Sequence, residues 1–112
     1  MTRLARSGPG TKLVVQIDPD LEDIVPGFLE NRRKDIVSIQ TAIPHGDFET
    51  IRMLGHRLKG DGGGYGFDAI SEIGTAIEHA AARRDAPALT QQTQILEDYL
   101  NRVEVVYRKE NG

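Results

Sequence analysis

The sequence has no cysteine and no tryptophan, and only three phenylalanines and three tyrosines among its 112 residues. Without cysteine there is no disulfide, no thiolate nucleophile and no cysteine-ligated metal. No apolar run approaches membrane-spanning length, and the N-terminus lacks the apolar core of a signal peptide. The net charge is −3, with acids and bases interspersed, so the basic surface that nucleic acids demand is missing. We therefore expect a cytoplasmic protein that has neither a nucleic-acid nor a membrane partner.

The remaining composition is that of an ordinary globular chain. Hydrophobic residues make up 38% and charged residues 28%, and the length suits a single domain with an aliphatic core. We interpret residues 1–17 as a flexible or extended lead-in, residues 18–108 as the folded domain and residues 109–112 as a frayed tail. Residues 13–17 have strand propensity. Because no second strand signal is apparent, we expect them to pack on the first helix as an extended segment.

Apolar residues recur at helical spacing in consecutive segments separated by Pro, Gly and Asp turns. Asp18, Asp47 and Asp85 are placed to cap helices. The predicted helices are a short one at residues 19–25 and four longer ones at about 26–43, 48 to between 62 and 66, 67–84 and 86–107. This pattern predicts an all-α fold: an antiparallel up-down four-helix bundle with a short extra N-terminal helix over one end.

Two features of these helices are irregular. Arg32 and Arg33 interrupt the apolar stripe of the first long helix, and we expect them at the edge of the core with their charged ends in solvent. Three consecutive glycines, 62–64, should fray the end of the following helix, since each interior glycine costs about 1 kcal/mol relative to alanine.

The most unusual stretch runs from Gly55 to Gly66 and combines a histidine, a lysine and a run of glycines. Its apolar stripe lies opposite His56, so the imidazole should project into solvent. Arg52 precedes it by one turn and Lys59 follows it by one turn. Gly60 and Gly63 fall on the same side of the helix.

Neutral imidazole is a good nucleophile that can attack an acyl phosphate and hold the phosphoryl group. Lys59 can attract the incoming phosphoryl oxygens as a point charge. Gly60 and Gly63 leave room for a partner's active site, and Arg52 flanks the histidine. We therefore interpret His56 as a phosphoryl acceptor. Lys59 is its electrostatic helper, and Arg52, Gly60 and Gly63 are partner-binding residues.

The run His56-Arg57-Leu58-Lys59-Gly60, followed by Gly66, resembles the His-x-Leu-Lys-Gly signature of histidine-containing phosphotransfer (HPt) domains. The resemblance covers roughly residues 18–107, which is most of the chain. It includes Phe28-Leu29, Gly46-Asp47 and the segment from Ile77 to Arg83. Asp61 departs from the family pattern, in which a small Ser or Ala usually follows the glycine. On the helix Asp61 points away from His56, so the chemistry should survive.

The resemblance implies a phosphoryl carrier of a two-component phosphorelay rather than an enzyme. His56 would exchange a phosphoryl group with the aspartate of a response-regulator receiver domain. A hybrid sensor histidine kinase would feed the relay, since the chain has no nucleotide-binding motif. No cofactor is expected on this chain, because the Mg²⁺ would belong to the receiver. The chain is expected to act as a monomer.

Two alternatives remain open. His56 could be an incidental surface residue of a non-catalytic helical interaction module. The chain could also be a dimerising histidine-kinase fragment, since Leu89, Thr93, Leu96, Leu100, Val103 and Tyr107 follow the spacing of a coiled-coil seam. A nucleotide loop is disfavoured because the glycines lack the Gly-Lys-Ser/Thr ending of a P-loop. No metal site is expected, because the three histidines lack metal-ligand spacing.

Overall fold

The computed structural model describes residues 11–108, so the first ten residues of the predicted lead-in (1–17) and the predicted tail (109–112) lie outside the described residues. Four helices account for most of the fold, as predicted. The elements in chain order are β1 (Leu13–Ile17), a 3₁₀ turn (Pro19–Leu21), α1 (Val25–Ala42), α2 (Phe48–Tyr65), α3 (Asp68–Ala82), α4 (Ala86–Arg102) and β2 (Val103–Tyr107).

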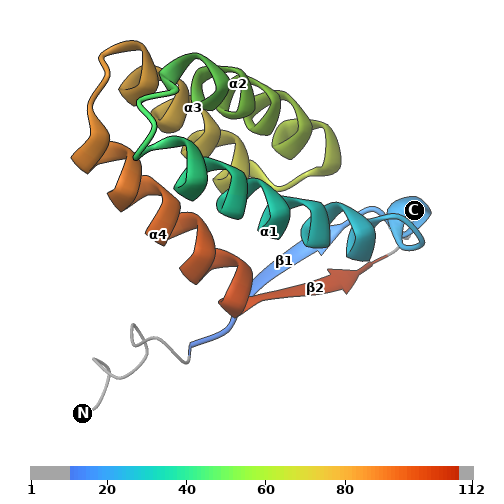
Figure 1. Cartoon of the computed structure of the whole chain (residues 1–112). Coiled ribbons are helices and arrows are strands. Elements are labelled where there is room, and N and C mark those ends of the chain that lie inside the picture. Colours follow the sequence, from blue (N-terminus) through green and yellow to red (C-terminus); the bar gives the residue numbers. More distant parts are fainter. Residues whose placement is uncertain (1–10, 109–112) are drawn as a thin grey trace.

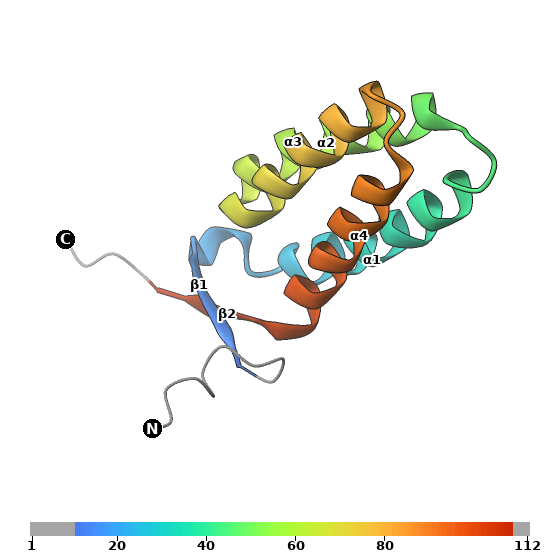
Figure 2. The same ribbon diagram turned by 90° about the vertical axis from the view of Figure 1, so that its left-hand side faces the viewer.

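The four helices pack as two pairs around an aliphatic core (Figures 1 and 2). α2 and α3 lie side by side along their length, and α1 and α4 form the other side. Phe28 stacks on Tyr65 and Arg32 lies near Asp61, so α1 and α2 run in opposite directions. The largest fully buried side chains are Val25, Ile39, Ile51, Leu58, Phe67, Ile70, Ile77, Leu89, Thr93 and Leu96.

Local sequence signals determine where the helices begin. The Asp47 carboxylate accepts a hydrogen bond from the Thr50 amide at 3.2 Å, at the start of α2. The Asp85 carboxylate accepts one from the Ala88 amide at 3.1 Å, at the start of α4. Both predicted caps are confirmed. Asp18 caps only a 3₁₀ turn, so the prediction of a helix at residues 19–25 was wrong.

Three helices end in the same backbone arrangement, with a left-handed residue just after the last turn. Gly46 (φ +66°) follows α1 and Gly66 (φ +92°) ends α2. In α2 the Phe67 amide donates to the Gly62 carbonyl at 2.7 Å, and this bond helps to hold the glycine run in the helix. α3 ends with Arg84 at φ 57°, a conformation that costs a residue with a side chain roughly 1–2 kcal/mol.

A parallel pair of strands closes one end of the bundle, beneath α1 and α4 (Figure 1). Leu13 is in register with Val103, and Ile17 is in register with Tyr107. The predictions of an unpaired extended segment and of a last helix reaching Tyr107 were both wrong, and the fold is not wholly helical. The segment Val103–Tyr107 is rich in β-branched residues, and Val103 already has an extended backbone (ψ 135°).

Arg32 lies inside the domain rather than at its edge, and this corrects the sequence-based prediction. Its side chain is only 7% exposed, and its Nε lies 2.9 Å from Asp35 Oδ2, an ion pair without the alignment of a hydrogen bond. Arg57 donates to the other Asp35 oxygen at 3.0 Å, and Arg32 also lies 3.7 Å from Asp61. Four alternating charges therefore compensate one another between α1 and α2. Arg33 is exposed and donates to the Leu100 carbonyl at 3.0 Å.

We predict that a charge destabilises the protein on one face of β1 and has little effect on the other. Val15 is half-buried against the core, whereas Val14 is 62% exposed. Val15→Asp should lower the free energy of unfolding by about 1–3 kcal/mol, because it places an unpaired carboxylate against apolar side chains. Val14→Asp should change it by less than about 0.5 kcal/mol. Urea denaturation measures both changes in unfolding free energy. Equal effects would contradict the assignment of Val15 to the core-facing side of β1 and of Val14 to the solvent-facing side.

Candidate functional site

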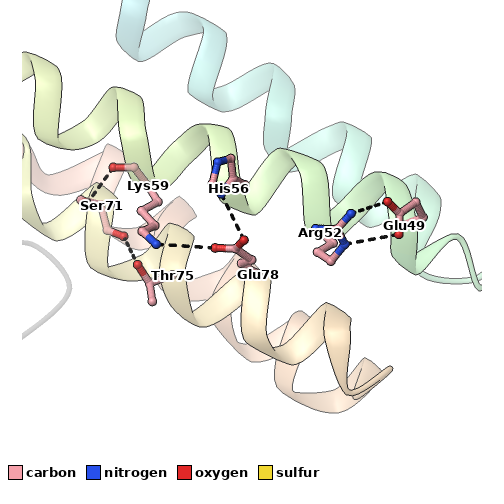
Figure 3. Close-up of polar contacts among 7 residues, drawn as sticks. All are labelled: Glu49, Arg52, His56, Lys59, Ser71, Thr75 and Glu78. Carbon is pink, nitrogen blue, oxygen red and sulfur yellow. Dashed lines mark hydrogen bonds and ion pairs between the residues drawn. The ribbon is translucent and has the colours of Figure 1, made fainter.

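His56 lies at the middle of α2, on the side of the helix that borders α3. Its side chain is 69% exposed, as the sequence pattern predicts. The ring approaches a carboxylate of the neighbouring helix, and its Nδ1 lies 3.1 Å from Oε2 of Glu78 on α3. Figure 3 shows both His56 and Lys59 reaching from α2 toward this glutamate. The Glu78 side chain is 19% exposed, so its carboxylate sits at the rim of the helix pair.

This contact indicates which ring nitrogen of His56 has a free lone pair. A carboxylate can only accept hydrogen bonds, so Nδ1 of a neutral His56 ring must carry the hydrogen. The lone pair is then on Nε2, the nitrogen on the other side of the ring. Glu78 therefore fixes both the tautomer and the orientation of the imidazole, and an exposed histidine without such a partner would rotate freely.

Lys59 lies one turn beyond His56 and shares the same carboxylate. Its Nζ is 4.0 Å from Glu78 Oε1, at the limit of an ion pair, and its side chain is 48% exposed. Such an exposed and distant pair is weak. The ammonium group can therefore leave Glu78 for a stronger anion, and a phosphoryl group on the adjacent imidazole would be one.

The three residues that the sequence predicts to bind a partner each have a different environment. Arg52 lies one turn before His56 and is engaged by Glu49 through two hydrogen bonds, which lower the pKa of the Glu49 carboxyl. A side chain at Gly60 would meet only open space, whereas one at Gly63 would approach Ser71 of α3 to 3.8 Å. Gly60 thus leaves the surface beside His56 bare, and Gly63 lies toward α3.

Close contact between the backbones of α2 and α3 brings Glu78 to His56. A Cβ built on Gly55 would lie 2.6 Å from the Glu78 amide nitrogen. One on Gly74 would lie 2.5 Å from the Lys59 amide nitrogen, and one on Gly62 would lie 2.6 Å from that of Ser71. No side chain fits at these three positions. Gly62 thus has a packing role, which the sequence alone left unexplained, whereas Gly64 faces open space.

A further hydrogen bond joins the two helices, because the Ser71 hydroxyl donates to the Lys59 carbonyl of α2 at 2.8 Å. The Thr75 hydroxyl donates to the Ser71 carbonyl at 3.1 Å, within α3. Asp61 faces α1 and Arg32, away from His56, as predicted. Sequence reasoning missed the part played by Glu78. The only available signal was its place in the segment that carried the family resemblance, because the contact joins residues 22 positions apart.

Within residues 11–108, no helix is long and apolar enough to cross a membrane. Over the same range, no group of three or more His, Asp or Glu side chains is placed to hold a metal ion. His45 and His79 are exposed, and His45 Nδ1 lies 2.9 Å from the Thr41 carbonyl oxygen.

A family model described as the Hpt domain matches residues 23–105, which is most of the chain. The chain belongs to the Hpt domain family. Hpt domains serve histidine phosphotransfer in phosphorelays, where they interact with receiver and kinase domains. Searches of curated proteins and of solved structures returned no match. The matched range of this Hpt domain contains all of α1 to α4, and so includes both His56 and Glu78.

We predict that Gly62 and Gly64 respond oppositely to alanine. Gly62→Ala should lower the free energy of unfolding by about 1–3 kcal/mol, because its methyl group would overlap the backbone of α3. Gly64→Ala should raise it by up to about 1 kcal/mol, since it removes a helix-interior glycine without any clash. Thermal and urea denaturation measure both changes. A stabilised Gly62→Ala variant would show that α2 and α3 are less closely packed than described.

Proposed function

We propose that this Hpt domain carries a phosphoryl group on Nε2 of His56, exchanging it with the aspartate of a response-regulator receiver domain. The observation that carries the proposal is the contact between His56 Nδ1 and Glu78, because it leaves the Nε2 lone pair available on an exposed ring. Gly60 has no side chain and faces open space, so a receiver can approach this ring from that part of α2 without steric obstruction.

The transfer is a substitution at phosphorus. The Nε2 lone pair forms the N–P bond while the P–O bond to the receiver aspartate breaks, and that electron pair leaves on the carboxylate oxygen. The ring becomes positively charged, and its Nδ1–H faces the Glu78 carboxylate, which stabilises this charge. Lys59 turns from Glu78 to the phosphoryl oxygens. Reversing the steps returns the phosphoryl group to an aspartate.

The proposal assigns no nucleotide site to this chain, and a hybrid sensor histidine kinase would be the source of phosphoryl groups. Divalent metal would be supplied by the receiver, where it would neutralise charge on the transferring group. The chain would act as a cytoplasmic monomer and a carrier. The alternative of a non-catalytic interaction module does not account for the paired approach of His56 and Lys59 to one carboxylate.

Labelling by a phosphorylated receiver domain tests the proposal. The wild-type chain should acquire label that is labile to acid and stable to base, and His56→Gln should acquire none. The exposed histidines provide matched controls, since His45→Gln and His79→Gln should both be labelled normally. Undiminished label on His56→Gln, or none on the wild type across a panel of receivers, would refute the proposal.

Lys59→Ala should accept label about tenfold more slowly, equivalent to about 1.4 kcal/mol of lost transition-state stabilisation. Its thermal unfolding should match the wild type, because the Lys59 side chain is half-exposed and only weakly paired. Single-turnover kinetics with excess phosphorylated receiver measures the rate. A rate equal to that of the wild type would show that Lys59 does not act on the phosphoryl group.

We predict that Glu78 acts through the orientation of His56. Glu78→Ala should slow transfer by about tenfold, whereas Glu78→Gln should retain more of the rate, because its amide oxygen still accepts from Nδ1–H. NMR of the imidazole nitrogens should show the Nδ1–H tautomer in the wild type and a mixture in Glu78→Ala. Glu72→Gln, an exposed change on the same helix, is the control. An unchanged tautomer in Glu78→Ala would contradict the assignment.

A further inference from the structure

A groove extends from the His56 site toward the end of α3. The groove lies between α2 and α3 and has a volume of about 290 Å³. Its lining is formed by Phe48, Glu49, Arg52, Ala81, Ala82 and Arg84.

Arg52 lies one turn before His56 on α2, and Ala81 lies one turn after Glu78 on α3. The groove therefore continues directly from the candidate site along the same helix pair.

The floor of the groove is apolar and its rim is charged. Ala81 is buried and Phe48 is half-buried, whereas Arg84 is exposed. The Arg84 guanidinium lies 4.9 Å from the centre of the Phe48 ring, a cation–π contact that holds the charge above the groove.

Among the described residues, Arg84 differs from the neighbouring arginines because no carboxylate pairs with it. Arg83 pairs with Asp85 at 3.4 Å, and Arg52 pairs with Glu49. Within residues 11–108, Arg84 forms no ion pair. It therefore leaves one uncompensated positive charge beside an apolar groove.

The backbone of Arg84 provides an independent observation. Among the described residues, it is the only one other than glycine with a positive φ. α1 and α2 end in the same hydrogen-bonded arrangement with Gly46 and Gly66 at this position. Glycine would relieve the strain at the end of α3 as well, so the arginine side chain is present at a cost to stability.

We propose that this groove is the docking site for a receiver-domain segment that presents an apolar side chain next to a carboxylate. The apolar side chain would lie between Phe48 and Ala81, and the carboxylate would pair with Arg84. This inference rests on the proposed function, because it specifies what the receiver partner must present. A guanidinium that no described carboxylate pairs with, above an apolar floor, suits a singly charged side chain better than a phosphate ion, which Glu49 would repel.

Arg84 acts on docking rather than on the transfer step, since it lies more than one helical turn beyond Glu78. Replacing it should weaken receiver binding, and the effect should diminish at high salt because the charges are exposed.

Titration of receiver domains against the His56→Gln variant tests the inference without phosphoryl transfer. For the receivers that bind, Arg84→Gly should raise Kd by about 5- to 20-fold, while its melting temperature stays equal or rises. Arg84→Gln keeps the backbone strain but removes the charge, and it should weaken binding to a similar extent. Arg83→Gly is the matched control and should change Kd by less than about twofold.

The outcomes separate this inference from the proposed function. If receivers bind and both Arg84 variants bind as tightly as their parent, the groove is not the docking site, although His56 can still be the acceptor. If Arg84→Gln alone binds normally, charge recognition is refuted. If no receiver binds the parent chain, the proposed function and this inference fail together.

Discussion

The close approach of α2 and α3 is the constraint on which the rest of the structure depends. At Gly55, Gly62 and Gly74 there is no room for a Cβ between the two backbones. Only at this separation does the short Glu78 side chain reach the imidazole of His56. Larger residues would force the helices apart, and the histidine would lose the partner that determines its tautomer. Packing and chemistry are therefore coupled through three glycines.

Features encoded by local sequence were predicted well. Asp47 and Asp85 cap helices because a side chain and an amide three residues later meet whenever the chain turns into a helix. The exposure of His56 and the position of Lys59 follow from helical spacing alone. These relations need no knowledge of the neighbouring elements, which explains why the sequence was sufficient.

Features that depend on distant residues were missed. The seam spacing that ends in Val103 and Tyr107 fits a helix as well as an alternating strand, and only pairing with β1 decides between them. Arg32 is buried because Asp35 and Asp61 compensate its charge, and Asp61 comes from another helix. Glu78 likewise reaches His56 from α3. In each case the deciding partner lies far along the chain.

The strand pair has a consequence for the order of folding. The Arg102 side chain donates to the Thr11 carbonyl across 91 positions of sequence, beside a strand pair that joins equally distant segments. Closing so long a loop is slow, whereas the helices and the short α2–α3 connection form from local contacts. We therefore expect the strands to assemble last and to open first. The helix pair that carries His56 would stay closed during such an opening.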